Sequence, residues 1–136
     1  MICHNNTTVE FYEGVYGPTI MISVQDREWL LLFLEVVRQL ESNEISELDI
    51  AGFKEVEKLE IGRLDLIMGP YTSLRELPLA QDQIAKSFTW TVDTLSIDWI
   101  IGGIELLLSC DEEGHYYFYE GKEMTIVLSY KEISRT

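Results

Sequence analysis

Short runs that alternate hydrophobic and polar residues cover much of the chain and predict β-strands. In residues 87–92, Phe88, Trp90 and Val92 fall on one side and serine or threonine on the other. This period of two is typical of a half-buried strand. Comparable runs, bounded by glycine or proline, occupy residues 8–12, 19–24, 115–119 and 123–130. We therefore expect a hairpin near each end of the chain and a strand between them.

The pattern around Gly62 leaves two arrangements open. Residues 59–61 and 63–68 are both strand-like and flank this glycine. They fit either one strand with a bulge or two strands joined by a tight turn.

A first longer segment has the period of an amphipathic helix. Asp26 is a suitable N-cap, and the helix is expected to end near Ser42. Its predicted buried face consists of Trp29, Leu32, Phe33, Val36, Val37 and Leu40, with Leu30 at the edge. Leu31 instead falls among charged residues, with Leu34 at the border. Either a loop or the N-terminal hairpin covers Leu31, or Leu31 and Leu34 contact a partner such as a second copy of the chain.

A second helix is expected over residues 95–110, after Asp93 or Thr94. It is apolar nearly all round, which predicts a position in the middle of the fold. Its narrow polar stripe consists of Thr94, Asp98, Gly102, Glu105 and Ser109. This stripe is either a solvated edge, with Gly102 and Gly103 allowing close packing on a sheet, or a pair of carboxylates around a shallow dip.

The predicted elements follow the order ββα-ββ-β-α-ββ. Strands and helices that do not alternate regularly favour an α+β fold, here a mostly antiparallel sheet of about five to seven strands with two main helices. The chain has 136 residues, a common size for one domain, so we expect a single domain over 1–136.

The net charge of the chain bears most strongly on its expected function. The chain carries 24 acidic and 10 basic side chains, a net charge of −14, which lies beyond the usual range of about 2 to 8 charges for a small domain. Such a chain repels nucleic-acid phosphates, so we expect no nucleic-acid binding and a basic protein partner. The acids concentrate in residues 41–60 and 105–123. The partner-binding candidates among them are Glu41, Glu44, Glu47, Asp49, Asp111, Glu112 and Glu113.

An aromatic run follows the second acidic group. In a regular strand, His115, Tyr117 and Tyr119 share one face and Tyr116 and Phe118 share the other. One face is expected to be core. The face of His115, Tyr117 and Tyr119 either holds the sheet together through cross-strand pairs or adds to the partner-binding surface.

Recognisable catalytic and metal chemistry is sparse. Cys3, His4, Cys110 and His115 include the ligand types of a zinc site, but their spacing lacks a C-x-x-C pair, so we expect no metal and no cofactor. No nucleotide-binding or catalytic motif is present, which favours a non-enzymatic protein. Two alternatives stay open: an enzyme or ligand-binding module that uses His115 with Asp98 or Glu105, and a homo-oligomeric structural module.

Targeting signals are also lacking in the sequence. The first residues have neither the basic nor the apolar region of a signal peptide, and no apolar run is long enough to cross a bilayer. We therefore expect a cytoplasmic protein that does not bind membranes.

A strongly acidic α+β chain with aromatic strands and no catalytic motif resembles the immunity proteins of bacterial toxin systems, including contact-dependent growth inhibition. This likeness covers the whole chain in general character. Separately, Phe88-Thr89-Trp90, Asp98-Trp99, Gly114-His115-Tyr116-Tyr117 and Ile126-Val127-Leu128-Ser129 look similar to segments of small bacterial proteins. The resemblance to immunity proteins implies a protein that binds a cognate toxin, often a basic nuclease, and covers or distorts its active site. Acids of residues 41–60 or of the turn at Glu112 would then replace nucleic-acid phosphates.

Overall fold

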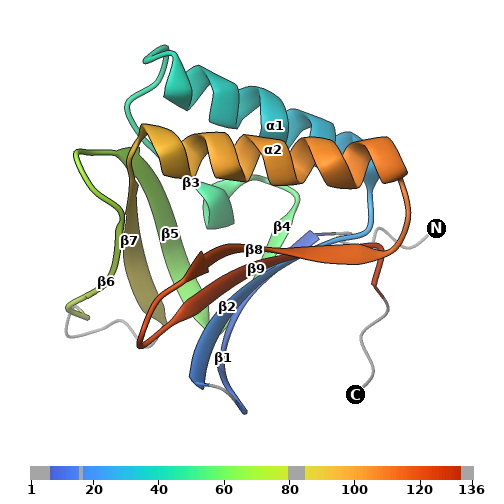
Figure 1. The fold of residues 1–136 in the computed structure, drawn as a ribbon. Coiled ribbons are helices and arrows are strands. Elements are labelled where there is room, and N and C mark those ends of the chain that lie inside the picture. Colours follow the sequence, from blue (N-terminus) through green and yellow to red (C-terminus); the bar gives the residue numbers. More distant parts are fainter. Residues whose placement is uncertain (1–6, 16, 80–84, 133–136) are drawn as a thin grey trace.

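The computed structural model describes residues 7–15, 17–79 and 85–132 as two helices packed over two β-sheets (Figure 1). The elements in chain order are β1 (Thr7–Gly14), β2 (Gly17–Val24), α1 (Arg27–Glu41), β3 (Leu48–Asp49), the 3-10 turn η1 (Ile50–Gly52), β4 (Val56–Leu59), β5 (Ile61–Met68), β6 (Ser73–Leu77), β7 (Lys86–Val92), α2 (Thr94–Cys110), β8 (Gly114–Glu120) and β9 (Thr125–Tyr130). The predicted α+β class and the two helices are confirmed. The short strands β3 and β6 are additional to the predicted order.

The strands form two mixed sheets rather than one. The large sheet has the order β4-β1-β2-β9-β8, and the small sheet has the order β3-β5-β7-β6. The pairs β1–β2, β3–β5, β6–β7 and β8–β9 are antiparallel, and β1–β4, β2–β9 and β5–β7 are parallel. The two predicted hairpins are therefore confirmed, and antiparallel pairing predominates as expected.

The core lies between the helices and the two sheets. Alternate residues of the strands point into it, including Phe88 and Trp90 of β7, both fully buried. The ring of Trp90 stacks on Phe118 of β8 at a centroid distance of 6.0 Å, so the core is continuous between the small and the large sheet. The predicted half-buried strand at residues 87–92 is confirmed.

The segment around Gly62 matches neither predicted arrangement in full. A bulge between Ile61 and Arg63 interrupts β5, as the first arrangement requires. However, β4 and β5 belong to different sheets, so β4 is neither part of the same strand nor its hairpin partner. The chain changes sheet at Glu60, which has a positive φ of 60°.

Helix α1 has the predicted ends but a shifted buried face. Asp26 caps it by accepting a hydrogen bond from the backbone N–H of Glu28 at 3.0 Å, and Ser42 is the C-cap. Leu32, predicted to be core, is exposed, whereas Leu34 is 9% exposed. The prediction of a partner contact through both Leu31 and Leu34 is therefore wrong for Leu34.

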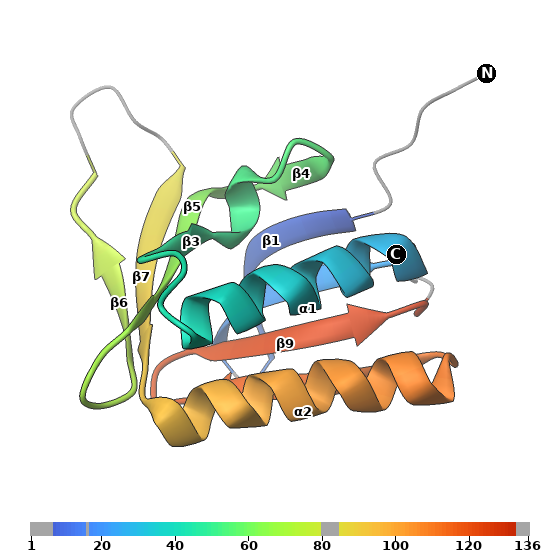
Figure 2. The ribbon, with the colours of Figure 1, turned by 90° about the horizontal axis from the view of Figure 1, so that it is seen from above.

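The neighbouring helix explains this shift. Helix α2 runs antiparallel to α1 and lies beside it (Figure 2). We call the two helices together the helical layer. Arg27 donates to the carbonyl of Leu108 at 2.7 Å, and Arg38 pairs with Glu105, so this side of α1 faces α2. Leu31 and Leu34 fall on the same side, since residues 27, 31, 34 and 38 follow one helical stripe. Helix α2, rather than a loop or hairpin, flanks Leu31, but Leu31 remains 46% exposed, so a partner contact at Leu31 stays a prediction.

Helix α2 does not lie in the middle of the fold, contrary to the prediction. It begins after the N-cap Asp93 and forms an outer layer with one face exposed. The adjacent glycines differ in role. A Cβ on Gly103 would lie 2.8 Å from Cγ of Tyr116 and even nearer to two other carbons of the same ring. A Cβ on Gly102 would have no neighbour within 4 Å. Gly103 alone allows the close packing that was predicted for both.

Candidate functional site

The predicted acidic candidates lie at two opposite ends of the helical layer. Glu41 and Glu44 lie at the end of α1, beside the start of α2. Glu112 and Glu113 follow the end of α2, beside the start of α1 (Figure 2). Since α2 has 17 residues, the two groups are separated by about 25 Å along its axis. One broad partner surface could therefore reach both groups.

Asp49 belongs to the predicted set, but its carboxylate is used within the fold. Oδ1 of Asp49 accepts hydrogen bonds from the backbone N–H groups of Ala51 at 3.1 Å and Leu64 at 3.0 Å. Oδ2 lies 3.9 Å from Arg63. Asp49 thus caps the turn η1 and ties it to β5, a structural role that the sequence did not reveal.

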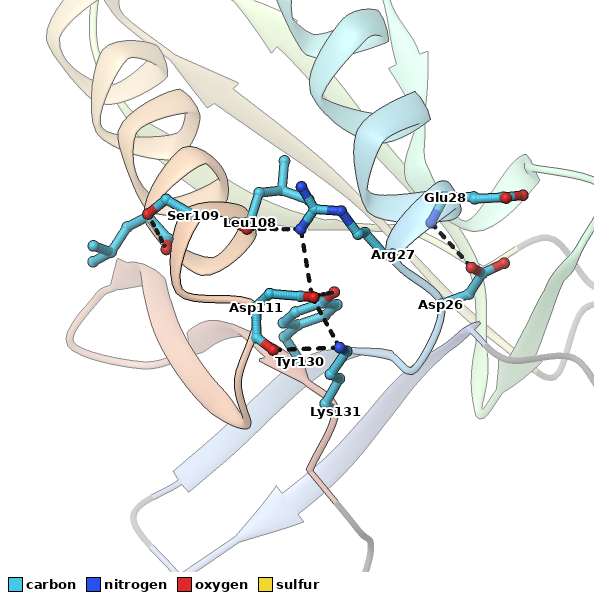
Figure 3. A network of polar contacts seen from close by, with 9 residues as sticks. Asp26, Arg27, Glu28, Leu108, Ser109, Asp111, Tyr130 and Lys131 are labelled. Atoms are coloured by element: carbon cyan, nitrogen blue, oxygen red, sulfur yellow. Dashed lines mark hydrogen bonds and ion pairs between the residues drawn. The ribbon is translucent and has the colours of Figure 1, made fainter.

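Asp111 is the centre of a second internal network (Figure 3). Oδ1 of Asp111 accepts a hydrogen bond from the Tyr130 hydroxyl at 2.7 Å and from Lys131 at 2.9 Å, with Arg27 at 3.4 Å. The bonds from Lys131 and then Tyr130 are the main causes that lower the pKa of Asp111 to about 2. The network joins the end of α2 to β9 and to the start of α1. Asp111 therefore holds these elements together rather than presenting a free carboxylate.

The remaining acidic candidates are exposed. Glu44, Glu47, Glu112 and Glu113 have no ion pair within residues 7–15, 17–79 and 85–132. Glu44 accepts one hydrogen bond, from the hydroxyl of Ser42 at 2.8 Å. These four carboxylates therefore lack an ion-pair partner in the described part of the chain, although Glu47 lies close enough to Arg63 for their charges to interact.

Glu41 lies close to a second carboxyl group, that of Asp98. The interaction of its carboxyl group with the side chain of Asp98 on the facing helix, followed by partial burial and the Asp98 charge, raises the pKa of Glu41. Arg38 lies nearby and acts in the opposite direction, but it also forms the ion pair with Glu105. Two like-charged groups thus meet at the outer edge of the helical layer.

The aromatic strand β8 does not have the predicted faces. His115 and Tyr117 share one face, where their rings meet edge to face at 5.5 Å. A bulge between Tyr117 and Tyr119 reverses the alternation, and Tyr119 packs against the core instead. One inserted residue has this effect because side chains alternate with a period of two.

His115 and Tyr117 line a shallow hollow of about 490 Å³ on the face of the large sheet opposite the helices. Nδ1 of His115 lies 3.2 Å from Glu132. The alternative site of His115 with Asp98 or Glu105 is wrong, because Tyr116 is the β8 residue that faces α2 and His115 points to the other side.

An exposed apolar row on α2 was missed by the sequence interpretation. Leu95, Trp99 and Leu106 are 81%, 55% and 53% exposed, and their spacing places them on one stripe of the helix. We call these three residues the α2 stripe. A helix that is apolar nearly all round is expected to be buried. The regular spacing of these three residues next to Asp98 and Glu105 was the signal that this face of the helix is exposed to solvent.

The four residues of zinc-ligand type cannot be placed together in the part of the chain that the structure describes. Cys3 and His4 lie outside the described residues, and Cys110 is exposed. Within residues 7–15, 17–79 and 85–132, no group of three or more His, Cys, Asp or Glu side chains has the geometry to hold a metal ion. No metal chemistry can therefore be assigned to the residues described.

Comparison of this chain with protein-family models, curated proteins and solved structures found no match. Neither described helix combines the length and apolar character needed to cross a bilayer.

Proposed function

We propose that this chain is a cytoplasmic, non-enzymatic inhibitor that binds a basic protein, in the manner of a bacterial immunity protein that neutralises a nuclease-like toxin. The observation that carries the proposal is the set of exposed carboxylates at both ends of the helical layer that have no ion pair within the described residues. These are Glu44 and Glu47 at one end and Glu112 and Glu113 at the other.

The spacing of these groups fits one protein–protein interface. A stable interface buries about 800 Å² on each partner, a patch about 30 Å across. The two acidic ends, about 25 Å apart along α2, lie within that size. A basic partner would therefore meet both ends at once.

Charge of this kind acts mainly on the rate of association. Exposed acids attract a basic partner over about one Debye length, 8 Å at physiological salt, and raise the association rate. Each exposed pair contributes little to the final affinity. The acidic ends are thus expected to steer and orient the partner, while tight binding needs further contacts.

The test uses the C-terminal domain encoded by the reading frame next to the gene of this chain. We expect that domain to stop bacterial growth when it is expressed alone and not to stop growth when this chain is co-expressed. A domain that is harmless alone, or toxic regardless of this chain, contradicts the proposal.

A charge-reversal pair tests the role of the acidic ends. Glu44→Lys with Glu47→Lys should slow association with that domain by about tenfold at low salt and reduce its salt dependence. Glu55→Lys with Glu57→Lys is the matched control, because it changes the net charge equally at exposed positions near β4. Equal slowing by both double variants would show that only the total charge matters.

A further inference from the structure

We propose that the α2 stripe and the carboxylates beside it form the tight-binding part of the interface, and that they receive a partner surface whose apolar side chains are flanked by arginine or lysine. This inference rests on the proposed function and names the contact that the acidic ends alone do not supply. The occupant is a basic protein, not a second copy of this chain.

The α2 stripe is an aligned apolar row, with Gly102 between Trp99 and Leu106, rather than a scattering of single exposed residues. Leu95 and Leu106 are separated by about 16 Å along the helix, and Trp99 lies between them on the same stripe. Isolated exposed leucines are common on protein surfaces. Aligned apolar side chains of this size mark contact surfaces more often.

Trp99 is held in place although half of it is exposed. Its indole N–H donates to the carbonyl of Tyr117 at 2.9 Å, and its ring lies 5.0 Å from that of Tyr116. A tryptophan fixed in this way loses little side-chain entropy on binding. Tryptophan is also among the residues that contribute most at protein interfaces. The ring is thus pre-positioned as an anchor for a partner.

Charge decides which partner fits. Helix α2, residues Thr94–Cys110, contains no lysine or arginine, and Asp98 and Glu105 flank the stripe. On α1, Arg27 is bound to Leu108 and Asp111, and Arg38 to Glu105. A second copy would bring like charges together, which is unfavourable, whereas a basic surface is complementary.

Glu41 and Asp98 give the basic partner a defined point of contact. Glu41 is the last residue of α1, and Asp98 lies in the first turns of α2 beside Leu95 and Trp99, so two carboxyl groups of like charge lie beside the start of the stripe. A guanidinium or ammonium group placed between them would replace repulsion by two favourable charge contacts. An arginine or lysine next to an apolar partner residue is therefore the expected match.

The first experiment measures binding of the full chain to the domain encoded by the neighbouring reading frame. Leu95→Ala with Leu106→Ala should weaken this complex by at least tenfold, mainly through faster dissociation. Leu79→Ala, at an exposed position beyond the end of β6, is the matched control and should leave affinity unchanged. The urea midpoint of each variant checks that the fold is intact.

Two failures are distinguishable in this experiment. If the wild-type chain does not bind the domain, the proposed function is wrong. If the wild-type chain binds and the Leu95→Ala, Leu106→Ala variant binds equally well, the function stands and the assignment of the α2 stripe is wrong.

A second probe does not depend on the neighbouring domain. A synthetic amphipathic helix of leucine and arginine is compared with a scrambled peptide of the same composition. We expect the amphipathic peptide to bind at least tenfold more tightly and to change the fluorescence of Trp99, since Trp29 and Trp90 are buried. Equal binding of both peptides would refute the inference, because charge alone would then explain it.

The oligomeric state tests the choice of occupant. Sedimentation of the wild-type chain should show a monomer. A dimer that becomes monomeric in the Leu95→Ala, Leu106→Ala variant would show that a second copy covers the stripe, and would overturn the proposed basic occupant.

Discussion

Adjacent glycines in α2 should respond in opposite ways to the same substitution. Gly102→Ala places a methyl group in open space, with no atom within 4 Å. Gly103→Ala places it against the ring of Tyr116, 2.8 Å from Cγ and closer to two other ring carbons. Because both residues share one helix, their intrinsic helix preferences cancel in the comparison.

The expected sizes follow from helix preference and packing. Alanine is favoured over glycine in a helix interior by about 0.8–1.0 kcal/mol. For a chain of 136 residues, that gain corresponds to a rise in Tm of about 3 °C. At Gly103 the same gain is opposed by overpacking, which costs about 1–3 kcal/mol. The ring of Tyr116 cannot withdraw freely, because Trp99 packs on it at 5.0 Å. Because the helix gain is the same at both positions, we expect Gly103→Ala to be about 1–3 kcal/mol less stable than Gly102→Ala.

Urea unfolding followed by far-UV circular dichroism measures both variants. The Tyr116→Ala background supplies a control, since removing the ring should make Gly103→Ala neutral or stabilising there. Equal stabilisation by both alanine variants in the wild-type background would refute the packing argument. A loss at Gly103 that persists without the Tyr116 ring would place the clash elsewhere.

Three further predictions concern the acidic groups. The pKa of Asp111 is lowered to about 2, below its usual 3.8, so its stabilising effect is complete above about pH 4 and is lost as the pH falls towards 2. Asp111→Asn should therefore be less stable at pH 7 and lose less stability in acid, as shown by urea midpoints across this range. The pKa of Glu41 is raised by its interaction with Asp98, so ionisation of Glu41 destabilises the fold as the pH rises; Glu41→Gln should be more stable than wild type at pH 7 but not at pH 4. Asp49→Ala removes a cap and leaves the N–H of Leu64 without its acceptor, which should cost about 1–2 kcal/mol in urea unfolding.

Features fixed by neighbours in the sequence were predictable. Asp26 and Asp93 each accept a hydrogen bond from the first turn of the following helix, so the helix starts follow from residue type and position. The alternation in residues 87–92 likewise identified β7. Such local signals predicted the elements and the fold class.

Features decided by distant contacts were not predictable in the same way. Leu32 and Leu34 both lie near the border of the apolar face of α1, and only the position of α2 determines that Leu34 is buried. The bulge in β8 moves Tyr119 away from His115 without any proline or glycine to mark it. The separation of β4 and β5 into two sheets is equally invisible in their local pattern.

The acidic residues show the same limit at the candidate site. In the sequence, Asp49 resembles Glu47, and Asp111 resembles Glu112. The structure separates them, because Asp49 and Asp111 bind partners within the fold and the two glutamates are exposed. Net charge predicted a basic partner, but the distinction between structural and exposed acids required the backbone donors and the bases that surround each one.

Gly102 connects the stability of α2 to its proposed use. An exposed glycine in a helix interior costs about 1 kcal/mol relative to alanine, and no packing contact requires it here. It lies between Trp99 and Leu106, where bare backbone lets a partner side chain approach the helix more closely than a methyl group would. If the α2 stripe binds the basic partner, Gly102→Ala should stabilise the free chain and yet weaken the complex. A variant that is more stable and binds unchanged would show that the partner does not approach the helix at this point.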